Sequence, residues 1–372
     1  MRFLTLFPKC ENVHLIKDVG MVPFILHKEY NHDTTIGCYE NGKYPYLDND
    51  VKGLKLRFMK RVFNNTKLDS LLFLFLNFRR YDALQVYHFS IESLLYLTFF
   101  KILKMFNTDA KTYLKLDADD DILKLQLKGI AGTLGRYLIA KIGLISVETK
   151  LLFSELIDRK LFNKNLQYIP NGFYDNKIRR EIDYKHKKNV FLTVGRIGTY
   201  QKSNEVLIEA FKKFCEFDDI WKLELIGNVE SSFLIFMDEF LIENPKLRSR
   251  IELIGPIYDR ESLIKKYDYA KVFVLSSRYE SFGLVYLEAM SAGCTIISTA
   301  ITPAYDVTEN GKYGRLFPID DVDSLAKVMK DVSSDASYLE SNCDSIQKYA
   351  YHNFYWPTII KEIDQFLTQK KY

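Results

Sequence analysis

The sequence lacks paired cysteines. Its five cysteines are scattered along 372 residues, with no CxxC pair and no histidine next to any of them. Disulfide frameworks and structural zinc sites both need cysteines at close, paired spacings. The pattern therefore predicts reduced thiols in a cytoplasmic protein, with neither a disulfide framework nor a zinc site.

A hydrophobic run of membrane-spanning length is also missing. The two most apolar stretches, residues 71–76 and 94–100, are far shorter than the roughly 20 residues that a transmembrane helix needs. Residues 2–7 form a strand-like stretch with no small-residue cleavage site, so we expect no signal peptide. We therefore expect a cytoplasmic protein that does not cross a bilayer.

What is present is an ordinary globular composition, with 47% hydrophobic and 27% charged residues, and a length that suits two domains. The net charge of +4 is unevenly distributed. Residues 1–180 carry 28 Lys and Arg against 19 Asp and Glu, whereas the remainder carries 24 against 29. The excess predicts that the first half faces something anionic: nucleic acid, an anionic lipid surface or a phosphorylated acceptor.

Short apolar runs alternate with helical patterns throughout the second half. The predicted strands there are residues 190–194, 223–226, 251–254, 272–275 and 295–297. Such alternation predicts βαβ units with a parallel sheet that is buried on both faces. In a sheet of this kind ligands bind at the carboxyl ends of the strands.

The first half has a similar but less regular pattern. Its predicted strands are residues 3–7, 83–87, 112–116 and 144–147. We expect an N-terminal Rossmann-like domain at 1–172, a charged linker at 173–188, a C-terminal Rossmann-like domain at 189–355 and a final helix at 356–372.

Two glutamates flank the turn that follows the predicted strand 272–275. Seven residues separate Glu280 from Glu288, which is roughly 12 Å if the segment is helical. That length suits a ribose, a diphosphate and a sugar, and carboxylates accept hydrogen bonds from hydroxyl pairs. Between the glutamates, Phe282, Gly283 and Leu284 open a helix whose free N–H groups favour an anion.

Arg196 and Lys202 flank a short loop after the predicted strand 190–194. Both are expected at the carboxyl edge of the same sheet as Glu280. A guanidinium and an ammonium together suit a diphosphate that leaves with additional negative charge.

These motifs together resemble glycosyltransferase family 4. The resemblance rests on Val194-Gly195-Arg196 with Lys202, Leu225-Ile226-Gly227, Ile254-Gly255, the stretch from Ser276 to Val285, and Glu288-Ala289-Met290. Ile169-Pro170-Asn171-Gly172 and Glu309-Asn310-Gly311 with Gly314 match flanking landmarks of that family. The similarity is strong over about residues 168–330.

The resemblance implies a GT-B fold: two Rossmann-like domains with parallel sheets facing across a cleft, and a last helix that crosses back to the first domain. It also implies that the nucleotide-sugar is held by the second domain, the acceptor by the first, and that the anomeric configuration is retained without a metal. Carried over by position, Arg196 and Lys202 bind the diphosphate and Glu280 the donor sugar. The other donor-binding positions are Glu288, Gly227, Ser281, Phe282, Gly283 and Leu284.

On the first domain the family often has a Gly-Gly pair after the first strand. Here the segment 8–20 offers only Gly20, with Asp18 just before it, and we assign both residues to the acceptor side. His88 follows the predicted strand 83–87, where family members often carry a histidine close to the donor sugar. A histidine hydrogen-bonded at a strand end is the equally supported alternative.

The acidic run 117–121 allows a rival interpretation, a DxD motif that binds a metal and a nucleotide diphosphate. An acidic first helical turn accounts for Asp119–121 as well, because carboxylates favour a helix N-terminus. The motif also falls in the half that the resemblance does not assign to the nucleotide. We therefore expect neither a metal nor a cofactor.

Residues 121–143 place basic side chains among apolar ones, and the basic members are Lys124, Lys128, Arg136 and Lys141. Such a segment either lies on an anionic membrane or forms a domain helix with a solvated basic face. Nucleic acid is not expected as a partner, because no motif of interleaved aromatic and basic residues accompanies the charge.

The predicted function is hexosyl transfer from a nucleotide diphosphate sugar, with UDP favoured, to a glycan or lipid-linked acceptor in cell-surface polysaccharide synthesis. The predicted location is the cytoplasm, with peripheral contact at the inner face of the membrane. The alternatives are a nucleotide-sugar epimerase or a sugar phosphorylase of the same fold, and a non-catalytic scaffold subunit of a glycosyltransferase complex.

Overall fold

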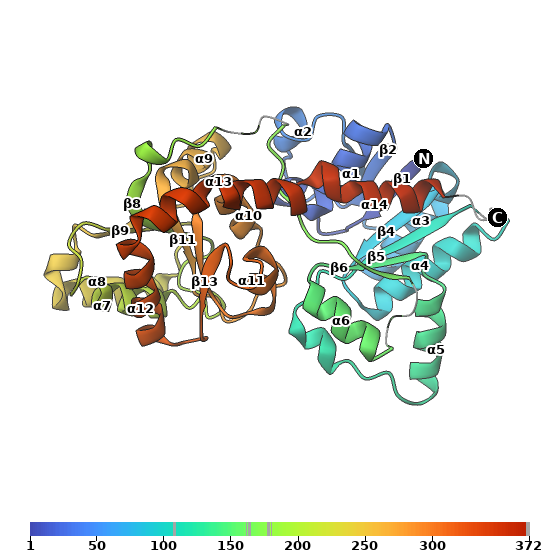
Figure 1. The fold of residues 1–372 in the computed structure, drawn as a ribbon. Coiled ribbons are helices and arrows are strands. Elements are labelled where there is room, and N and C mark those ends of the chain that lie inside the picture. The colour runs from blue at the N-terminus through green and yellow to red at the C-terminus, as the bar shows by residue number, and fades with distance from the viewer. Residues whose placement is uncertain (107–108, 161, 163–164, 177–178, 180, 370–372) are drawn as a thin grey trace. The chain divides into compact units, whose positions relative to one another are not determined.

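The computed structural model describes residues 1–106, 109–160, 162, 165–176, 179 and 181–369. The chain divides into two compact units. Unit 1 comprises residues 1–172 and 355–372, and unit 2 comprises residues 173–354. Each unit is a parallel sheet between layers of helices (Figure 1).

Unit 1 contains a seven-stranded parallel sheet in the order β3-β2-β1-β4-β5-β6-β7. Its strands are β1 (Arg2–Leu6), β2 (Asp33–Cys38), β3 (Lys55–Phe58), β4 (Ala83–Tyr87), β5 (Lys111–Lys115), β6 (Leu144–Val147) and β7 (Leu166–Tyr168). The central strands β4 and β5 are buried along their whole length because helices cover both faces of the sheet.

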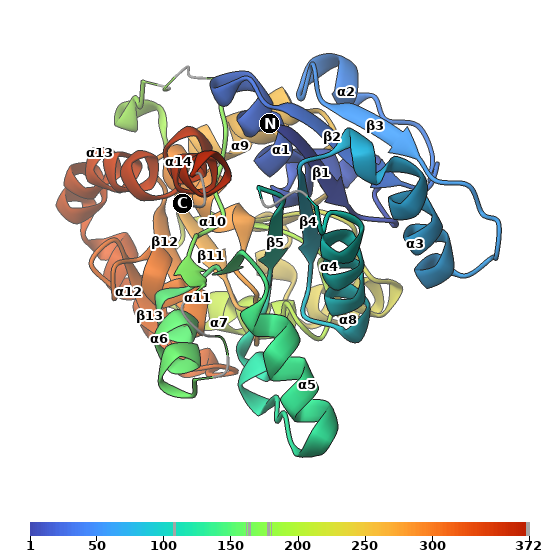
Figure 2. The ribbon, with the colours of Figure 1, turned by 90° about the vertical axis from the view of Figure 1, so that its right-hand side faces the viewer.

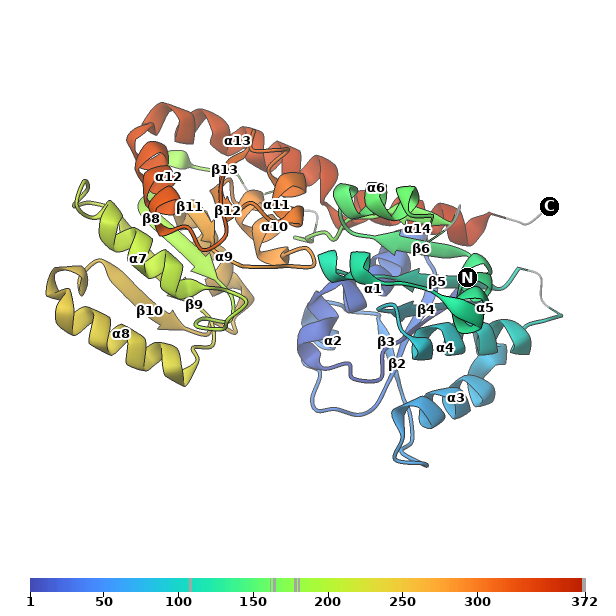
Figure 3. The same ribbon diagram turned by 90° about the horizontal axis from the view of Figure 1, so that it is seen from below.

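The helices of unit 1 are α1 (Asp18–Tyr30), α2 (Tyr46–Asn49), α3 (Thr66–Asn77), α4 (Ile91–Leu103), α5 (Gly129–Ala140), α6 (Lys150–Asp158) and α14 (Trp356–Thr368). Figures 2 and 3 show α3 and α4 on one face of the sheet. On the other face, α14 returns from the end of the chain and lies beside α1 (Figure 1). His32 Nε2 lies 2.7 Å from Asp364 Oδ1, which joins the end of α1 to α14.

Unit 2 contains a six-stranded parallel sheet in the order β10-β9-β8-β11-β12-β13. Its strands are β8 (Lys188–Val194), β9 (Lys222–Ile226), β10 (Ile251–Gly255), β11 (Ala270–Leu275), β12 (Thr295–Thr299) and β13 (Gly314–Phe317). Its helices are α7 (Asn204–Phe214), α8 (Ser231–Glu243), α9 (Arg260–Tyr269), α10 (Leu284–Ser291), α11 (Thr302–Val307), α12 (Val322–Ser334) and α13 (Ala336–Asn353). Figure 3 shows α7 and α8 together on one side of this sheet.

The two-domain α/β prediction is confirmed, and both sheets have the strand order of a doubly wound fold. In each sheet the order reverses beside the first strand of the unit, between β1 and β4 in unit 1 and between β8 and β11 in unit 2. Such a reversal leaves a crevice at the carboxyl ends of the two strands, where ligands of open α/β sheets bind. The topology thus selects one edge of each sheet for a functional site.

Four strands were not predicted: β2, β3, β7 and β13. β3 is an edge strand with mostly exposed side chains, and β7 has only three residues, so neither shows the apolar run that marks a buried strand. The segment expected as a linker, 173–188, belongs to unit 2 where it is described, and it ends in a short 3-10 helix, Tyr184–His186. The expected last helix is α14, and its residues Ile359, Ile360 and Ile363 are buried.

No helix among the described residues is both long enough and apolar enough to span a membrane.

Candidate active site

The candidate donor site lies at the carboxyl ends of β8 and β11, where the strand order of unit 2 reverses. Lys202 is in the loop after β8, and Glu280 is in the loop after β11. Lys202 Nζ lies 2.5 Å from Glu280 Oε1, and Ser277 Oγ donates to the same oxygen at 2.7 Å. The fold thus brings together two residues that stand 78 positions apart in the chain.

This ion pair is largely withdrawn from water. The side chains of Lys202 and Glu280 are 11% and 9% exposed. Burying charges is costly unless they are paired and their remaining polar atoms are hydrogen-bonded. Ser277 and Gln201 supply those additional bonds to Glu280, and Ser276 Oγ donates to the Lys202 carbonyl at 2.9 Å. The pair is therefore held in a defined geometry before any ligand arrives.

Arg196 lies at the exposed rim of the same site. Its guanidinium donates a hydrogen bond to Gln201 Oε1, and Gln201 Nε2 in turn donates to the Tyr279 carbonyl at 3.0 Å. Gln201 therefore connects Arg196 to the Glu280 loop. The Arg196 guanidinium and the Lys202 ammonium thus lie on the loop after β8, beside the Glu280 carboxylate on the loop after β11.

Gly227 follows β9 and permits a close approach of two loops. It has a φ of +141°, and a Cβ built there would lie 1.7 Å from the Gly195 carbonyl oxygen. Any other residue would therefore force apart the loops after β8 and β9. The structure supports a packing role for Gly227, which was predicted as a donor-binding position.

The turn before α10 is built from the predicted Ser281, Phe282 and Gly283. Gly283 is the N-cap, with a φ of +83° that favours glycine, and α10 begins at Leu284. The Phe282 side chain is fully buried and its ring packs against Phe354, with ring centroids 5.8 Å apart. In this described segment the backbone N–H groups of Phe282, Gly283 and Leu284 donate to no protein acceptor that the structure records. They are thus available to an anion at the positive end of α10.

Glu288 lies further along α10 and has different neighbours from Glu280. Tyr267 Oη donates to Glu288 Oε2 at 2.8 Å, and both residues line a small cavity of about 40 Å³ with Tyr174 and Arg260. Burial, and then the Glu288 carboxylate, raise the pKa of the Tyr267 hydroxyl well above its usual range, so it remains a donor. The structure therefore pairs Glu288 with a tyrosine on α9 and does not bring it into the Lys202–Glu280 network.

Several residues of this site were missed from the sequence, chiefly Gln201, Ser277 and Arg278. Arg278 Nε donates to Asp320 Oδ2 at 2.9 Å, and Ser203 Oγ donates to Asp320 Oδ1 at 2.9 Å. Gln201 lies next to Lys202, and Ser277 and Arg278 lie in the stretch from Ser276 to Val285 that carries the family resemblance, but none of the three was assigned to the site. Asp320 carried no signal, because only the fold brings it to this edge.

In unit 1, His88 and Asp18 both lie at the corresponding edge of the sheet. His88 directly follows β4, has a φ of +60°, and its Nδ1 lies 4.0 Å from Asp117 Oδ2. Asp18 is the first residue of α1 and is buried. Lys115 Nζ, at the end of β5, lies 3.9 Å from Asp18 Oδ2 and 2.6 Å from Glu148 Oε1. Neither Lys115 nor Glu148 was singled out from the sequence.

Gly20 is also in α1, so the end of the segment 8–20 is helical from Asp18 onward. A Cβ at Gly20 would lie 2.1 Å from the Leu15 carbonyl oxygen. This glycine lets the helix pack onto the preceding turn of backbone, which is a structural reason for its presence beside a candidate site.

The acidic run after β5 forms a short turn. Asp119 caps the 3-10 helix Asp120–Lys124 by accepting a hydrogen bond from the Asp121 N–H at 3.1 Å. Over the described part of the chain, no three His, Cys, Asp or Glu side chains are grouped so that they could hold a metal ion. This geometry agrees with the capping interpretation of Asp119 and Asp121.

Residues 175–353 match the family model described as glycosyl transferases group 1. Unit 2 is therefore a group 1 glycosyltransferase domain, which confirms the resemblance seen in the sequence.

Two curated relatives are glycosyltransferases. An uncharacterized glycosyltransferase of Methanocaldococcus jannaschii is 30% identical over 52% of this chain and 48% of that protein. The capsular polysaccharide biosynthesis glycosyltransferase CapM of Staphylococcus aureus is 26% identical over 61% of this chain and 63% of that protein. The matches thus span about half to two thirds of the length of these relatives.

Solved structures of similar fold cover the whole chain. A glycosyltransferase from Rickettsia africae superposes with a TM-score of 0.76 at 16% identity, covering 100% of this chain and 99% of that one. The Anabaena protein HepE, in complex with UDP and glucose, superposes with a TM-score of 0.73 at 15% identity and 99% coverage of both chains. At such low identity the likeness establishes the fold, which is GT-B.

Proposed function

We propose that this protein is a retaining hexosyltransferase that uses a nucleotide diphosphate sugar, with UDP as the favoured nucleotide. The observation that carries the proposal is the Lys202–Glu280 pair, with Arg196 beside it, at the strand-order reversal of a group 1 glycosyltransferase domain. The HepE structures in complex with UDP and with UDP-glucose support the choice of nucleotide.

The geometry of unit 2 suits the departure of a diphosphate. Arg196 and Lys202 supply positive charge at one edge of the sheet, and the N–H groups before α10 add preorganised donors. Such groups stabilise charge that develops in the transition state at little reorganisation cost. Glu280, paired with Lys202, is positioned to accept hydrogen bonds from donor-sugar hydroxyls.

In the proposed reaction the bond from the anomeric carbon to the diphosphate oxygen breaks, and the acceptor oxygen bonds to that carbon on the same face. The acceptor proton moves to the departing diphosphate oxygen. No protein nucleophile is required, and the tight pairing of Glu280 with Lys202 and Ser277 favours a binding role for that carboxylate.

We also propose that the acceptor is a glycan or lipid-linked glycan of cell-surface polysaccharide synthesis, as the name of the CapM relative suggests.

A specific feature of unit 1 supports contact with an anionic membrane from the cytoplasmic side. Helix α5 exposes Ile130, Leu134 and Tyr137, which are spaced along one helix face.

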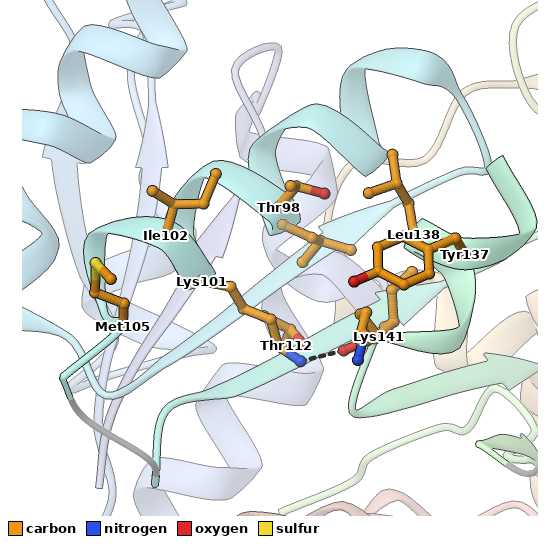
Figure 4. A pocket seen from close by; sticks show the side chains of 10 residues that line it. Thr98, Lys101, Ile102, Met105, Thr112, Tyr137, Leu138 and Lys141 are labelled. Carbon is orange, nitrogen blue, oxygen red and sulfur yellow. Dashed lines mark hydrogen bonds between the residues drawn. The ribbon is translucent and has the colours of Figure 1, made fainter. Parts of the chain in front are cut away.

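Beside them an apolar groove of about 300 Å³ opens between α4 and α5 (Figure 4). Ile102 and Met105 line it with exposed side chains, and Lys101 donates a hydrogen bond to the Lys141 carbonyl. Exposed apolar side chains with lysines at the rim are typical of surfaces that contact anionic lipid. The groove lies at the amino end of β5, where Thr112 lines it, roughly 10 Å along the strand from Lys115 at the carboxyl edge of the unit 1 sheet. It therefore suits membrane attachment rather than binding of the reacting end of an acceptor.

The test of the transferase proposal is donor cleavage by the purified chain. We expect UDP release from one of a panel of UDP-hexoses, and a product whose anomeric proton coupling shows retention in NMR spectra. The Glu280→Gln and Lys202→Ala variants should release little UDP. A chain that cleaves no nucleotide-sugar would support the scaffold alternative, and an inverted product would refute the retaining mechanism.

A further inference from the structure

Four ionisable side chains converge at the carboxyl edge of the unit 1 sheet. Lys115 is the last residue of β5, Asp117 follows it, Glu148 follows β6, and Asp18 begins α1. Lys115 Nζ lies 2.6 Å from Glu148 Oε1 and 3.9 Å from Asp18 Oδ2. The cluster occupies the region of the strand-order reversal between β1 and β4.

Two members of this cluster, Lys115 and Glu148, are fully buried and hydrogen-bonded to each other. Lys115 and Glu148 have side chains that are 1% and 0% exposed. Glu148 Oε1 accepts from Lys115, and Glu148 Oε2 accepts from the Ala118 N–H at 3.3 Å. The pair therefore ties the loop after β5, which carries Asp117, to the end of β6.

Asp18 is buried, and its charged neighbour Lys115 lies beyond hydrogen-bond distance. Its side chain is 10% exposed, and its Oδ2 makes no hydrogen bond to any atom of the described chain. Burial, and then the nearby Asp117 carboxylate, raise the pKa of the Asp18 carboxyl to about 7. A buried carboxyl oxygen that lacks a donor is costly, so a ligand that supplies one would be favoured at this position.

The cluster reaches solvent at Asp117 and His88. Their side chains are 25% and 56% exposed, and both residues have positive φ angles, of 41° and 60°. Non-glycine residues in that region occur often at functional sites, where the surrounding structure holds them. The cluster itself is acidic, because its four described members are one lysine, Lys115, and three carboxyl groups, those of Asp18, Asp117 and Glu148. Unit 1 as a whole is nevertheless basic.

We infer that Asp18, Asp117 and His88 bind the hydroxyl groups of a neutral sugar on the acceptor, over a floor formed by Lys115 and Glu148. This inference rests on the proposed function, since it takes unit 1 as the acceptor domain. A hydroxyl is a hydrogen-bond donor, so it can donate to the ionised carboxylates of Asp18 and Asp117. A phosphate would meet three carboxyl groups, so the phosphorylated acceptor suggested by the basic half does not bind through its phosphate here.

The test measures sugar binding directly, in the absence of any nucleotide-sugar. Saturation-transfer NMR on the full chain would use the methyl α-glycosides of glucose, galactose and mannose, together with glucose 6-phosphate and glucosamine as charged probes. We expect at least one neutral glycoside to bind and glucose 6-phosphate to bind more weakly. The Asp18→Asn and Asp117→Asn variants should each weaken the glycoside signal about tenfold, the usual effect of losing one hydrogen bond to a charged group.

Asp33→Asn is the matched control, because Asp33 is an exposed carboxylate of the same unit, paired with Lys55 on the sheet surface. Thermal melting of each variant would show that it is folded. Stronger binding of glucose 6-phosphate or of glucosamine than of every glycoside would overturn the inference, as would equal glycoside binding by the wild type and both variants. A signal lost in Glu280→Gln but not in Asp18→Asn would place the sugar in unit 2 and also refute it.

UDP release from the donor, measured in parallel, depends on unit 2 and tests the proposed function separately. A chain that binds glycosides through Asp18 but cleaves no donor would refute the transferase proposal and leave the sugar site standing.

Discussion

Lys202 Nζ lies 2.5 Å from Glu280 Oε1, and this ion pair joins the loops that follow β8 and β11. Each residue is the nearest opposite charge that the structure shows for the other, and both are mostly buried. Removing one partner leaves the other charge buried and alone, which is strongly destabilising. Arg196, by contrast, is exposed, and among the described residues its guanidinium donates to Gln201 alone. The two cations of the site should therefore respond differently to mutation.

We expect Arg196→Ala and Lys202→Ala each to raise the activation barrier by roughly 2–4 kcal/mol, as the loss of one preorganised donor does. Arg196→Ala should leave the free energy of unfolding within about 0.5 kcal/mol of the wild type, as exposed substitutions do. Lys202→Ala should also lower it measurably. Turnover measured with saturating donor, together with urea unfolding, separates the two effects. Arg248→Ala, an exposed arginine of the same unit, is the control, and near wild-type turnover in both site variants would contradict the assignment.

Activity should survive excess EDTA. The proposed leaving-group stabilisation uses Arg196, Lys202 and backbone N–H groups, so chelation of divalent ions should leave UDP release unchanged. The measurement is UDP release before and after incubation with EDTA and removal of the chelator. Activity that is lost, and that Mn²⁺ or Mg²⁺ restores, would revive the metal interpretation of the acidic run 117–121.

Asp18 should make the stability of unit 1 depend on pH. Its pKa is raised to about 7 in the folded chain, against a usual value near 3.9, so between these values the folded state binds more protons than the unfolded state. Its contribution to the free energy of unfolding is therefore present at acid pH and is lost as pH rises through about 7.

Asp18→Asn removes this titration. The variant should gain stability relative to the wild type between pH 5 and pH 8, by at most about 3 kcal/mol, because two pH units separate pH 5 from the folded-state pKa of about 7. Urea midpoints at the two pH values measure the change, with Asp33→Asn as the control. A difference between variant and wild type that is the same at both pH values would show that Asp18 is ionised throughout.

The buried Lys115–Glu148 pair should be sensitive to the loss of one member. Burial disfavours the Lys115 ammonium, but the Glu148 and Asp18 carboxylates outweigh this and raise its pKa above the usual range. Lys115→Met should cost about 3–5 kcal/mol of stability, because it leaves Glu148 buried without its cation. The double variant Lys115→Met with Glu148→Gln should recover part of that loss. A double variant less stable than Lys115→Met alone would contradict this account of the pair.

Part of the free energy of membrane binding should be electrostatic, so added salt should weaken the binding. We expect the chain to sediment with vesicles rich in anionic lipid at low salt and to be released near 0.5 M salt, where the Debye length is about 4 Å. Reversing Lys124 and Lys128 to Glu should weaken sedimentation by about 1 kcal/mol per residue without changing donor affinity. Both side chains are exposed beside α5.

The control for this experiment reverses Lys246 and Lys327, which are exposed lysines of unit 2, so that the total charge change is the same. Replacing Ile130 and Leu134 by Ser tests the apolar contribution. Equal recovery on neutral and anionic vesicles would leave a non-membrane acceptor as the better interpretation.

Much of unit 2 could be predicted because β8, β9, β10 and β11 are short, mostly apolar runs that end in, or are followed by, glycine or serine. The residues Arg196, Lys202 and Glu280 could be predicted for the same reason, since each follows such a strand closely. The strands β3 and β7 could not, because an exposed edge and a three-residue strand leave no periodic signal.

The sequence by itself determined the fold class, and it predicted the position of the candidate donor site and the residues that follow its strands, because burial patterns and turn-forming residues are local features of the sequence. Only the tertiary structure showed that Glu288 pairs with Tyr267, that Gly227 and Gly20 are required by close backbone packing, and that Asp320 bonds to Ser203 beside the candidate donor site. It alone brought Asp18, Lys115 and Glu148 together, across 130 positions of the chain. The physical reason is that strands far apart in the sequence end at the same edge of a parallel sheet. The burial of their side chains and the Coulomb interactions between them depend on distances in space, which cannot be read from the spacing of residues in the sequence.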